Sequence, residues 1–152
     1  MNYEQARAYA VNVSRSGSIL GLDSIENLMH ELGDIQERLK IIHIAGTNGK
    51  GSTGAYLERV LIEAGYRVGR YSSPAVFDPM EVWRINLQSM SHEEYADIME
   101  QVKCACDRMV EKGMEHPTIF EVETAMAFLY FNQNVIMYCW KLEWAAERMQ
   151  RM

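Results

Sequence analysis

Cysteine and histidine are scarce in this 152-residue sequence, and their spacing excludes several kinds of site. Three cysteines do not make a disulfide framework. Cys104 and Cys106 stand two apart in a helical stretch, so their side chains point to nearly opposite sides and cannot easily share a metal. The four histidines are scattered, without the spacing of a zinc site such as H-x-x-x-H. We therefore interpret the cysteines as free thiols.

Long apolar runs and an excess of positive charge are also missing. No apolar stretch reaches the length of a membrane span, and the N-terminal segment lacks the apolar core of a signal peptide. The net charge of −6 argues against a general binder of nucleic acid or anionic membranes, although a local basic pocket is compatible with it. The 48% of hydrophobic residues is ordinary for a soluble globular protein. We expect a cytoplasmic protein without nucleic-acid or membrane partners.

The hydrophobic pattern predicts alternating strands and helices. Ser91 and Glu94 have the spacing of a capping box, which marks the start of one helix. The run at 39–46 is rich in β-branched residues and predicts a parallel strand buried on both faces. Helices are expected over 3–13, 23–32, 52–64, 92–112 and 118–133, further strands over 67–74 and 134–138, and an extended segment over 82–91. This order predicts an α/β fold with a P-loop-containing, parallel (Rossmann-like) sheet flanked by helices.

A glycine-rich loop follows the first predicted strand and opens the next helix. Unpaired backbone N–H groups and the helix dipole attract anions there, and glycine lets the backbone approach a phosphate closely. A glycine-rich turn with a surface lysine is the alternative, but Lys50 and the hydroxyls of Ser52 and Thr53 follow in the order expected for phosphate and magnesium binding. The predicted ATP-binding residues are Gly46, Thr47, Asn48, Gly49, Lys50, Gly51, Ser52 and Thr53.

The spacing of the loop departs from the common G-x-x-x-x-G-K-[ST] pattern, which needs glycine at Ile44 and a hydroxyl residue at Gly51. The compact G-T-N-G-K-G-S-T at 46–53 instead resembles the P-loop of the Mur-ligase superfamily, in its folylpolyglutamate and dihydrofolate synthase branch. Two further segments resemble that family: GRYSSPAVF at 69–77 is similar to G-x-Y-T-S-P-H-L, and PTIFEVETAMAF at 117–128 is similar to T-x-F-E-x-x-T-x-x-A-F. Departures occur at Ala75 and Val76, in place of His-Leu, and in EVWRINLQ, in place of an E-R-I-x-x-N-G type segment.

The resemblance implies an ATP-dependent ligase that joins L-glutamate to a folate or to dihydropteroate through an acyl phosphate. It implies ATP and Mg²⁺ as cofactors, with K⁺ as a further candidate ion, and a monomer. Lys50 and Glu121 are implied as catalytic, Ser73 and Ser52 as metal ligands, and Phe120 with Glu121 near the pterin site. Two of these residues have alternatives: Ser73 as a turn residue before proline, and Glu121 as a first-turn acid favoured by the helix dipole.

Two other functions stay open from the sequence. The first is a non-catalytic nucleotide-binding module. The second is a fragment of a peptidoglycan-type Mur ligase, whose loop resembles G-T-N-G-K-T-[ST] and which lacks the Y-[ST]-S-P and T-x-F-E segments. A ligase assay beside a nucleotide-binding measurement separates a module from an enzyme.

The last segment, CWKLEWAAERMQRM at 139–152, departs from the family, which continues as L-E-V-G-[LM]-G-G-R-x-D-A-T-N. It has the pattern of a short amphipathic helix, but a one-base shift of the reading frame offers another explanation. Whatever the codons, the shifted frame encodes Leu across Cys139 and Trp140, Glu across Trp140 and Lys141, Gly across Trp144 and Ala145, and Ala across Met149 and Gln150. We expect 1–138 to be an incomplete N-terminal and central ATP-binding domain, 139–152 an aberrant tail, and the C-terminal glutamate-binding domain to be absent, which leaves this chain inactive alone.

Overall fold

The computed structural model describes residues 1–15, 22–134 and 138–143. These residues form two compact units, and each unit contains segments that are distant in the sequence. Of the described residues, the first unit contains 1–15, 22–37 and 91–130, and the second contains 38–90, 131–134 and 138–143. None of the helices in the described part has the length and hydropathy needed to cross a bilayer.

The first unit is helical, and the predicted helices are confirmed. It contains α1 (Tyr3–Ser14), α2 (Asp23–Glu31), α4 (His92–Glu111) and most of α5 (Ile119–Gln133), with a short 3-10 helix, η1 (Ile35–Arg38), at the boundary of the unit. Capping boxes begin two of the helices: Asn2 with Gln5 begins α1, and Ser91 with Glu94 begins α4. Gly33 and Gly113 adopt the left-handed conformation just after α2 and α4, which ends both helices where the sequence predicts.

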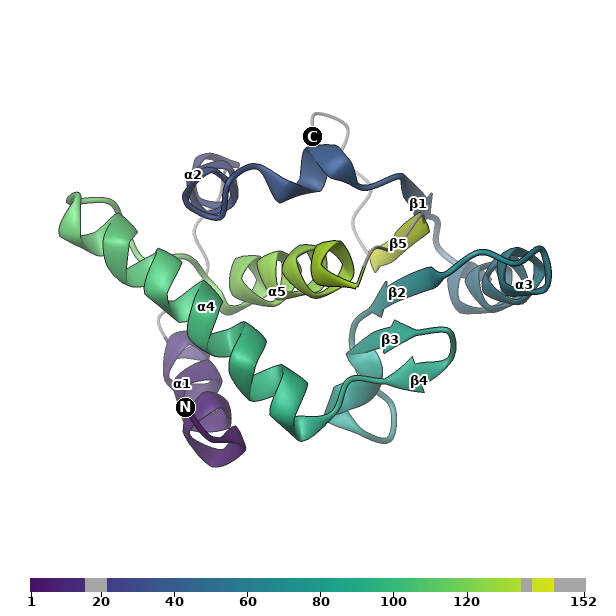
Figure 1. Cartoon of the computed structure of the whole chain (residues 1–152), viewed down its shortest axis with the longest axis horizontal. Coiled ribbons are helices and arrows are strands. Elements are labelled where there is room, and N and C mark those ends of the chain that lie inside the picture. The colour runs from purple at the N-terminus through teal and green to yellow at the C-terminus, as the bar shows by residue number, and fades with distance from the viewer. Residues whose placement is uncertain (16–21, 135–137, 144–152) are drawn as a thin grey trace. The chain divides into compact units, whose positions relative to one another are not determined.

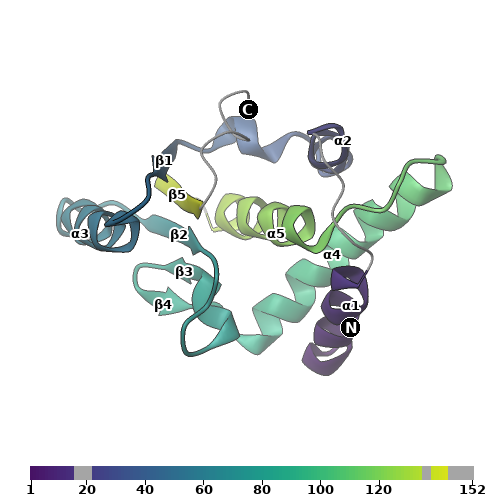
Figure 2. The same ribbon diagram turned by 180° about the vertical axis from the view of Figure 1, so that it is seen from behind.

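The core of this unit is formed by the inward faces of its helices. Figures 1 and 2 both show α1 lying beside α4. Apolar side chains at helical spacing are buried on both helices, and α5 is apolar nearly all round. The fully buried members include Ala6, Leu28, Met99, Val102, Met109, Val122 and Met126. Cys106 is buried and Cys104 exposed, and both are free thiols, as expected.

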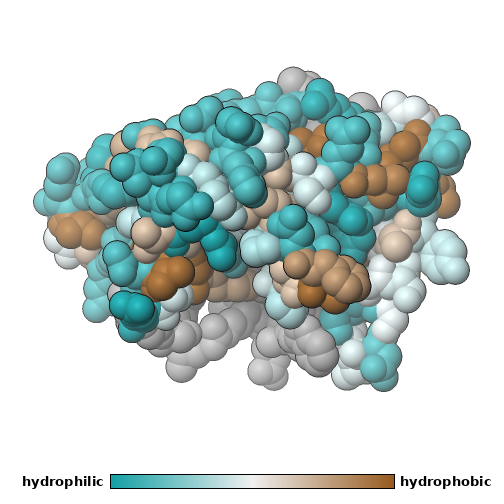
Figure 3. Space-filling view, turned by 90° about the horizontal axis from the view of Figure 1, so that it is seen from below, coloured by the Kyte–Doolittle hydropathy of each residue, from teal (hydrophilic) through white to brown (hydrophobic). Residues whose placement is uncertain are grey.

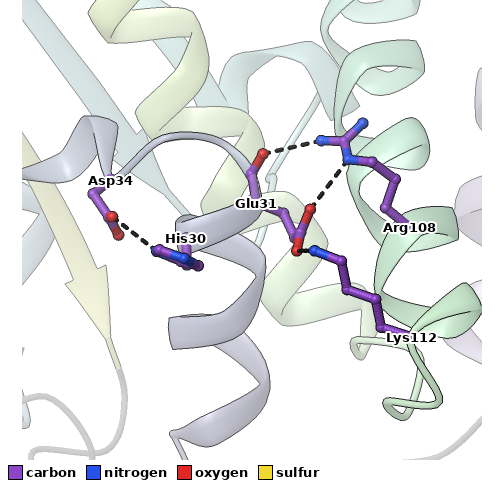
Figure 4. Close-up of polar contacts among 5 residues, drawn as sticks. All are labelled: His30, Glu31, Asp34, Arg108 and Lys112. Atoms are coloured by element: carbon purple, nitrogen blue, oxygen red, sulfur yellow. Dashed lines mark hydrogen bonds and ion pairs between the residues drawn. The ribbon is translucent and has the colours of Figure 1, made fainter.

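Ion pairs attach the end of α2 to α4. The Glu31 carboxylate accepts hydrogen bonds from Arg108 Nε at 3.1 Å and from Lys112 Nζ, and the Glu31 carbonyl accepts one from Arg108 Nη2 at 2.9 Å (Figure 4). His30 and Asp34 form a separate contact at 3.1 Å. The hydrogen bonds from Lys112 and then Arg108 lower the pKa of Glu31 below its ordinary value of 4.5. The ionised form of Glu31 therefore stabilises the folded state.

We expect Glu31→Gln to lower the stability of the chain at pH 7 and to have a progressively smaller effect as the pH falls below 4.5. A carboxyl whose folded-state pKa is depressed stabilises the fold above its unfolded pKa, and this contribution is lost as the pH falls through the folded-state pKa. Urea unfolding of both chains from pH 7 to pH 3 measures the difference. Glu37→Gln, at an exposed carboxylate of the same unit, is the control and should lower the stability at pH 7 less than Glu31→Gln does. The ion-pair explanation would be contradicted if the difference in unfolding free energy between Glu31→Gln and the unchanged chain were the same at pH 3 as at pH 7.

The second unit is a five-stranded sheet with one long helix packed against it. The strands are β1 (Ile41–Ala45), β2 (Val68–Ser72), β3 (Trp83–Ile85), β4 (Gln88–Ser89) and β5 (Tyr138–Glu143), in the order β1-β5-β2-β3-β4. Strands β1, β5 and β2 are parallel, as predicted, whereas β3 and β4 add an antiparallel hairpin to β2. Helix α3 (Lys50–Glu63) packs on β1, β5 and β2 (Figure 1), and a 3-10 helix, η2 (Pro79–Val82), precedes β3.

One expectation about burial in this unit is wrong. Strand β1 is an edge strand whose residues alternate between exposed and half-buried, so it is not buried on both faces; Ile41 is 43% exposed. On α3, Tyr56 and Val60 have helical spacing and are 77% and 64% exposed. The buried residues of α3 are Lys50, Gly54 and Glu58, four apart, so the face toward the sheet carries charge. In the view of Figure 3, apolar side chains reach the surface in separate areas among hydrophilic ones.

The last strand is displaced from its predicted position. A strand was expected over 134–138, but β5 runs over Tyr138–Glu143, and residues 135–137 lie outside the described part. β5 therefore contains the first five residues of the segment expected to be an aberrant tail. Residues 144–152 of that segment also lie outside the described part.

Two local features fix the middle of the sheet. The β3–β4 hairpin turns at Asn86 and Leu87, which both have positive φ (46° and 71°), and the Asn86 side chain accepts a hydrogen bond from Val68 N at 2.8 Å. The left-handed conformation favours glycine, so Leu87 is strained at the position that corresponds to glycine in the similar E-R-I-x-x-N-G segment. In β2, an added Cβ on Gly69 would lie 2.6 Å from the Phe131 ring, so only glycine fits there without rearrangement.

Candidate functional site

The glycine-rich loop connects β1 to α3 and leaves the start of α3 open. Gly49 is the N-cap residue with φ 76°, a conformation that glycine adopts without strain, and no side chain caps the helix. The first turn also contains no acidic residue, unlike that of α1 or α4. The first N–H groups of a helix have no acceptor within the helix. The beginning of α3 therefore presents N–H groups that have no acceptor within the helix, together with the positive end of the helix dipole.

Lys50, the first residue of α3, folds back over the loop. The residue is only 8% exposed, and its Nζ donates to the Gly46 carbonyl and, at 3.3 Å, to the Thr47 carbonyl. The Lys50 ammonium group therefore lies beside the glycine-rich loop that leads into α3. A cation and several N–H donors are gathered within one short segment, which suits a phosphate group.

The second wall of the site follows β2. Ser72 ends that strand and Ser73 follows it, a cis peptide joins Ser73 to Pro74, and Phe77 is 93% exposed. The Glu81 carboxylate accepts hydrogen bonds from the backbone N–H groups of Val76 and, at 3.0 Å, Phe77. These bonds lower the pKa of Glu81, since they favour its ionised form. Glu81 therefore holds the loop after Ser73 in place.

A pocket of about 430 Å³ lies between these two walls, entirely within the second unit. Residues 47–51 form one side, and residues 72–74 with Val76 and Phe77 form the other. Arg70, Glu81 and Arg84 complete the lining. The pocket thus combines three basic side chains, hydroxyl groups and an open helix start, which suits an anionic ligand that carries several phosphates.

Behind the pocket, a buried carboxylate joins two arginines. Glu58 on α3 is fully buried, and its Oε2 accepts from Arg70 Nη1 and Arg84 Nη2, each at 3.4 Å. Burial first, and then the charge of Arg84, lowers the pKa of Arg70. Glu58 and Arg70 were not among the residues that the sequence pointed to. A signal existed, because Glu58 lies eight residues after Lys50, on the same face of a helix.

The structure gathers many of the predicted site residues in this pocket. Thr47, Asn48, Gly49, Lys50 and Gly51 line it, and so does Ser73, the predicted metal ligand from the loop that follows β2. Gly46 belongs to the same loop. Ser52 and Thr53 stand in the first turn of α3, exposed and outside the lining. Within the described residues, no group of three or more His, Cys, Asp or Glu side chains is arranged to hold a metal ion.

Glu121 and Phe120 lie in the first unit, at the start of α5. Glu121 is buried, and its Oε2 accepts a hydrogen bond from Thr118 N at 2.7 Å, just before the helix. This is the bond that a third-position glutamate makes in a capping box. Phe120 is partly exposed, and its carbonyl accepts from the Thr124 hydroxyl at 2.7 Å. The contact of Glu121 supports its alternative interpretation as a helix-terminal acid, and its catalytic role stays a prediction.

Comparison with known proteins gives consistent results. A scan against protein-family models finds no match. The dihydrofolate synthase/folylpolyglutamate synthase of Bacillus subtilis is 37% identical over 129 residues, which are 85% of this chain and 30% of that protein. The crystal structure of folylpolyglutamate synthase from Thermotoga maritima matches 92% of this chain and 32% of its own, with 34% identity and a TM-score of 0.83. An FPGS–AMPPCP–folate complex matches 93% of this chain and 35% of its own, with 30% identity and a TM-score of 0.84. The chain therefore spans about a third of the length of these relatives.

Proposed function

Because the chain belongs to the folylpolyglutamate and dihydrofolate synthase family, we propose that it carries the ATP-binding part of a ligase that joins L-glutamate to a folate or to dihydropteroate. The observation that carries this proposal is the pocket between the P-loop at 46–53 and the loop after β2 that contains Ser73. It brings a buried lysine, an uncapped helix start and serine hydroxyls together. A similar solved structure is a complex with AMPPCP, an analogue of ATP, and folate.

In the proposed reaction, a carboxylate oxygen of the folate attacks the γ-phosphorus of ATP, and the bond from phosphorus to the β–γ bridging oxygen breaks, which releases ADP. The amine of glutamate then attacks the acyl carbon, the carbon–oxygen bond to phosphate breaks, and the amine loses a proton as the amide forms. Lys50 and the first amides of α3 would hold the β- and γ-phosphates and offset the charge that moves during transfer. The carboxylate needs this activation because its oxygen is a poor leaving group until it is phosphorylated.

Magnesium fits this pocket as a partner of the nucleotide. Mg²⁺ commonly keeps several waters and is bound by one or two protein groups plus substrate phosphates, so a site without a carboxylate cluster is compatible with it. Ser73 in the pocket, and Ser52 in the first turn of α3, would be the hydroxyl ligands. When bound, the ion supplies charge that neutralises the transferring phosphoryl group. The two serines belong to separate segments of the chain.

Gly51 offers a test that separates binding from folding. An added Cβ at Gly51 meets nothing within 4 Å, and the residue lies in a helix, so the fold does not require glycine there. Alanine favours a helix over glycine by up to about 1 kcal/mol, so Gly51→Ala should preserve or raise the thermal midpoint. The added methyl group would nevertheless stand where a phosphate approaches the backbone. We expect the affinity for MgAMPPCP, measured by calorimetry, to fall at least about tenfold. A change of this size corresponds to the loss of one charge-assisted hydrogen bond. Unchanged affinity together with unchanged stability would count against the proposed phosphate position.

A further part of the proposal concerns residues 139–152, which we propose are encoded in a shifted reading frame. The YCWKLE sequence of β5 contains Lys141 and Glu143, whereas a parallel strand between two others is usually a continuous apolar run. The shifted frame permits L-E-V-G-M-G-G-R-K-D-A-T-N, the family's own continuation. Nucleotide sequence across codons 130–152 decides the question. Codons that cannot encode L-E-V-G-x-G-G in the shifted frame would overturn the proposal.

A further inference from the structure

Two arginines stand directly opposite each other on neighbouring strands. Arg70 of β2 pairs with Arg84 of β3 in the antiparallel register, so both side chains lie on the same face of the sheet. The next pair in that register, Tyr71 and Trp83, stacks with ring centroids 6.3 Å apart. Like charges placed directly opposite each other destabilise a sheet. The fold therefore accepts an electrostatic cost at this position, and negative charge is needed to offset it.

Glu58 is the hydrogen-bonded counter-charge of both arginines. Both guanidinium groups contact the same oxygen, Oε2, at 3.4 Å, and the Glu81 carboxylate adds a second negative charge that acts on both. The contacts are longer than ordinary charge-assisted hydrogen bonds, which are about 2.7–2.9 Å. Among the described residues, the other oxygen, Glu58 Oε1, and Arg84 Nε are buried without a hydrogen-bond partner. Such buried donors and acceptors are costly unless another group pairs with them.

Both arginines also line the pocket that contains the P-loop. Lys50 and the open start of α3 form one positive region of this pocket, and Arg70 and Arg84 form another. The Arg84 side chain is 24% exposed and belongs to the lining of the pocket. A guanidinium group presents paired donors that match the oxygens of a carboxylate or a phosphate.

We propose that Arg70 and Arg84, positioned by Glu58, form a second anion subsite that binds an oxyanion beside the nucleotide phosphates held by the P-loop. The inference rests on the proposed function, and it adds a binding site for an oxyanion beside the nucleotide in the same pocket. The oxyanion is either the terminal phosphoryl group or the carboxylate that receives it. Glu58 acts through the arginines as a positioning residue, because one fully buried oxygen holds both guanidinium groups at the pocket wall.

Three titrations of the full chain with and without Arg84→Met test the subsite: MgADP, MgAMPPCP, and folate added to chain saturated with MgAMPPCP. We expect MgADP affinity to change by less than about twofold. A loss of about tenfold or more, the effect of one hydrogen bond to a charged group, is expected for one of the other ligands. A loss for MgAMPPCP assigns the subsite to the terminal phosphoryl group, and a loss for folate alone assigns it to the carboxylate. Arg59→Met, which removes an exposed charge from α3, is the control and should change none of the affinities.

The double variant Glu58→Gln with Arg84→Met separates binding from folding. Removing Arg84 alone weakens the compensation of a buried carboxylate and lowers the thermal midpoint, and neutralising Glu58 should restore part of it. Affinity should stay reduced in the double variant. The inference is overturned if affinity recovers together with stability, if all three affinities are unchanged, or if MgADP is weakened as much as the other ligands. No MgADP binding by the unchanged chain would instead overturn the proposed function, and the inference with it.

Discussion

Lys50→Met is expected to weaken the binding of MgAMPPCP by the chain roughly tenfold to a hundredfold, the effect of losing charge-assisted hydrogen bonds worth about 1.5–3 kcal/mol. The physical reason is the location of the ammonium group, which is buried against the Gly46 and Thr47 carbonyls at the wall of the pocket. Methionine keeps most of the length of the side chain but removes the charge and the donors. Isothermal titration calorimetry at fixed ionic strength measures the change.

Arg59→Met is the matched control for Lys50, since it removes one positive charge from an exposed position of the same helix. Exposed charges are screened by salt, so its effect should be small and should vanish as the ionic strength rises. The Lys50 variant should keep its defect in high salt. Affinities within twofold of each other for Lys50→Met and the unchanged chain would remove the basis of the ATP-binding proposal.

Gly69→Ala is expected to destabilise the chain by about 1–3 kcal/mol, the usual cost of overpacking a well-packed interior. The added Cβ would lie 2.6, 2.8 and 2.9 Å from three carbons of the Phe131 ring, which is itself fully buried. β2 lies between β5 and β3, so the strand cannot move away from the ring without disturbing both neighbours. Denaturant unfolding of the two chains gives the difference.

A double variant, Gly69→Ala with Phe131→Leu, identifies the cause of that loss. Phe131→Leu removes ring atoms and leaves a cavity, which is destabilising alone, but the methyl group added by Gly69→Ala can occupy part of that space. The double variant should therefore cost less than the sum of the two single changes. Additive costs would show that the ring is not the obstacle. Gly51→Ala, where an added Cβ meets nothing, is the control for the general effect of replacing glycine in this chain.

Local chemistry explains which parts of the fold could be predicted from the sequence. Helices α1, α2 and α4 begin or end at capping residues and left-handed glycines, and these signals act within a few residues. The loop at residues 46–53 was identifiable for the same reason, since its glycines, lysine and hydroxyl residues are contiguous. Its partner across the pocket, Ser73, was suggested only by resemblance, because proximity between two loops depends on how the strands are ordered.

The remaining features depend on tertiary structure. The periodicity of α3 fits an apolar stripe at Tyr56 and Val60, yet the face that α3 turns toward the sheet carries Lys50, Gly54 and Glu58. Lys50 and Glu58 share one face of the helix, but nothing local indicates that this face is the buried one, because its charge is compensated by Arg70 and Arg84 on two other elements. In the same way, nothing within β1 indicates that it lies at an edge of the sheet. Which face of an element is buried is decided by partners distant in the sequence.

The position of β5 has a consequence for the order of folding during synthesis. The strand that precedes the P-loop and the strand that precedes Ser73 do not pair with each other, since β5 lies between β1 and β2 and pairs with both. A growing polypeptide that has emerged only as far as β4 contains both loops, but it lacks β5, the strand that pairs with both β1 and β2. Nucleotide affinity should therefore arise late on the ribosome, after Tyr138–Glu143 has emerged, even though the P-loop itself was made about ninety residues earlier.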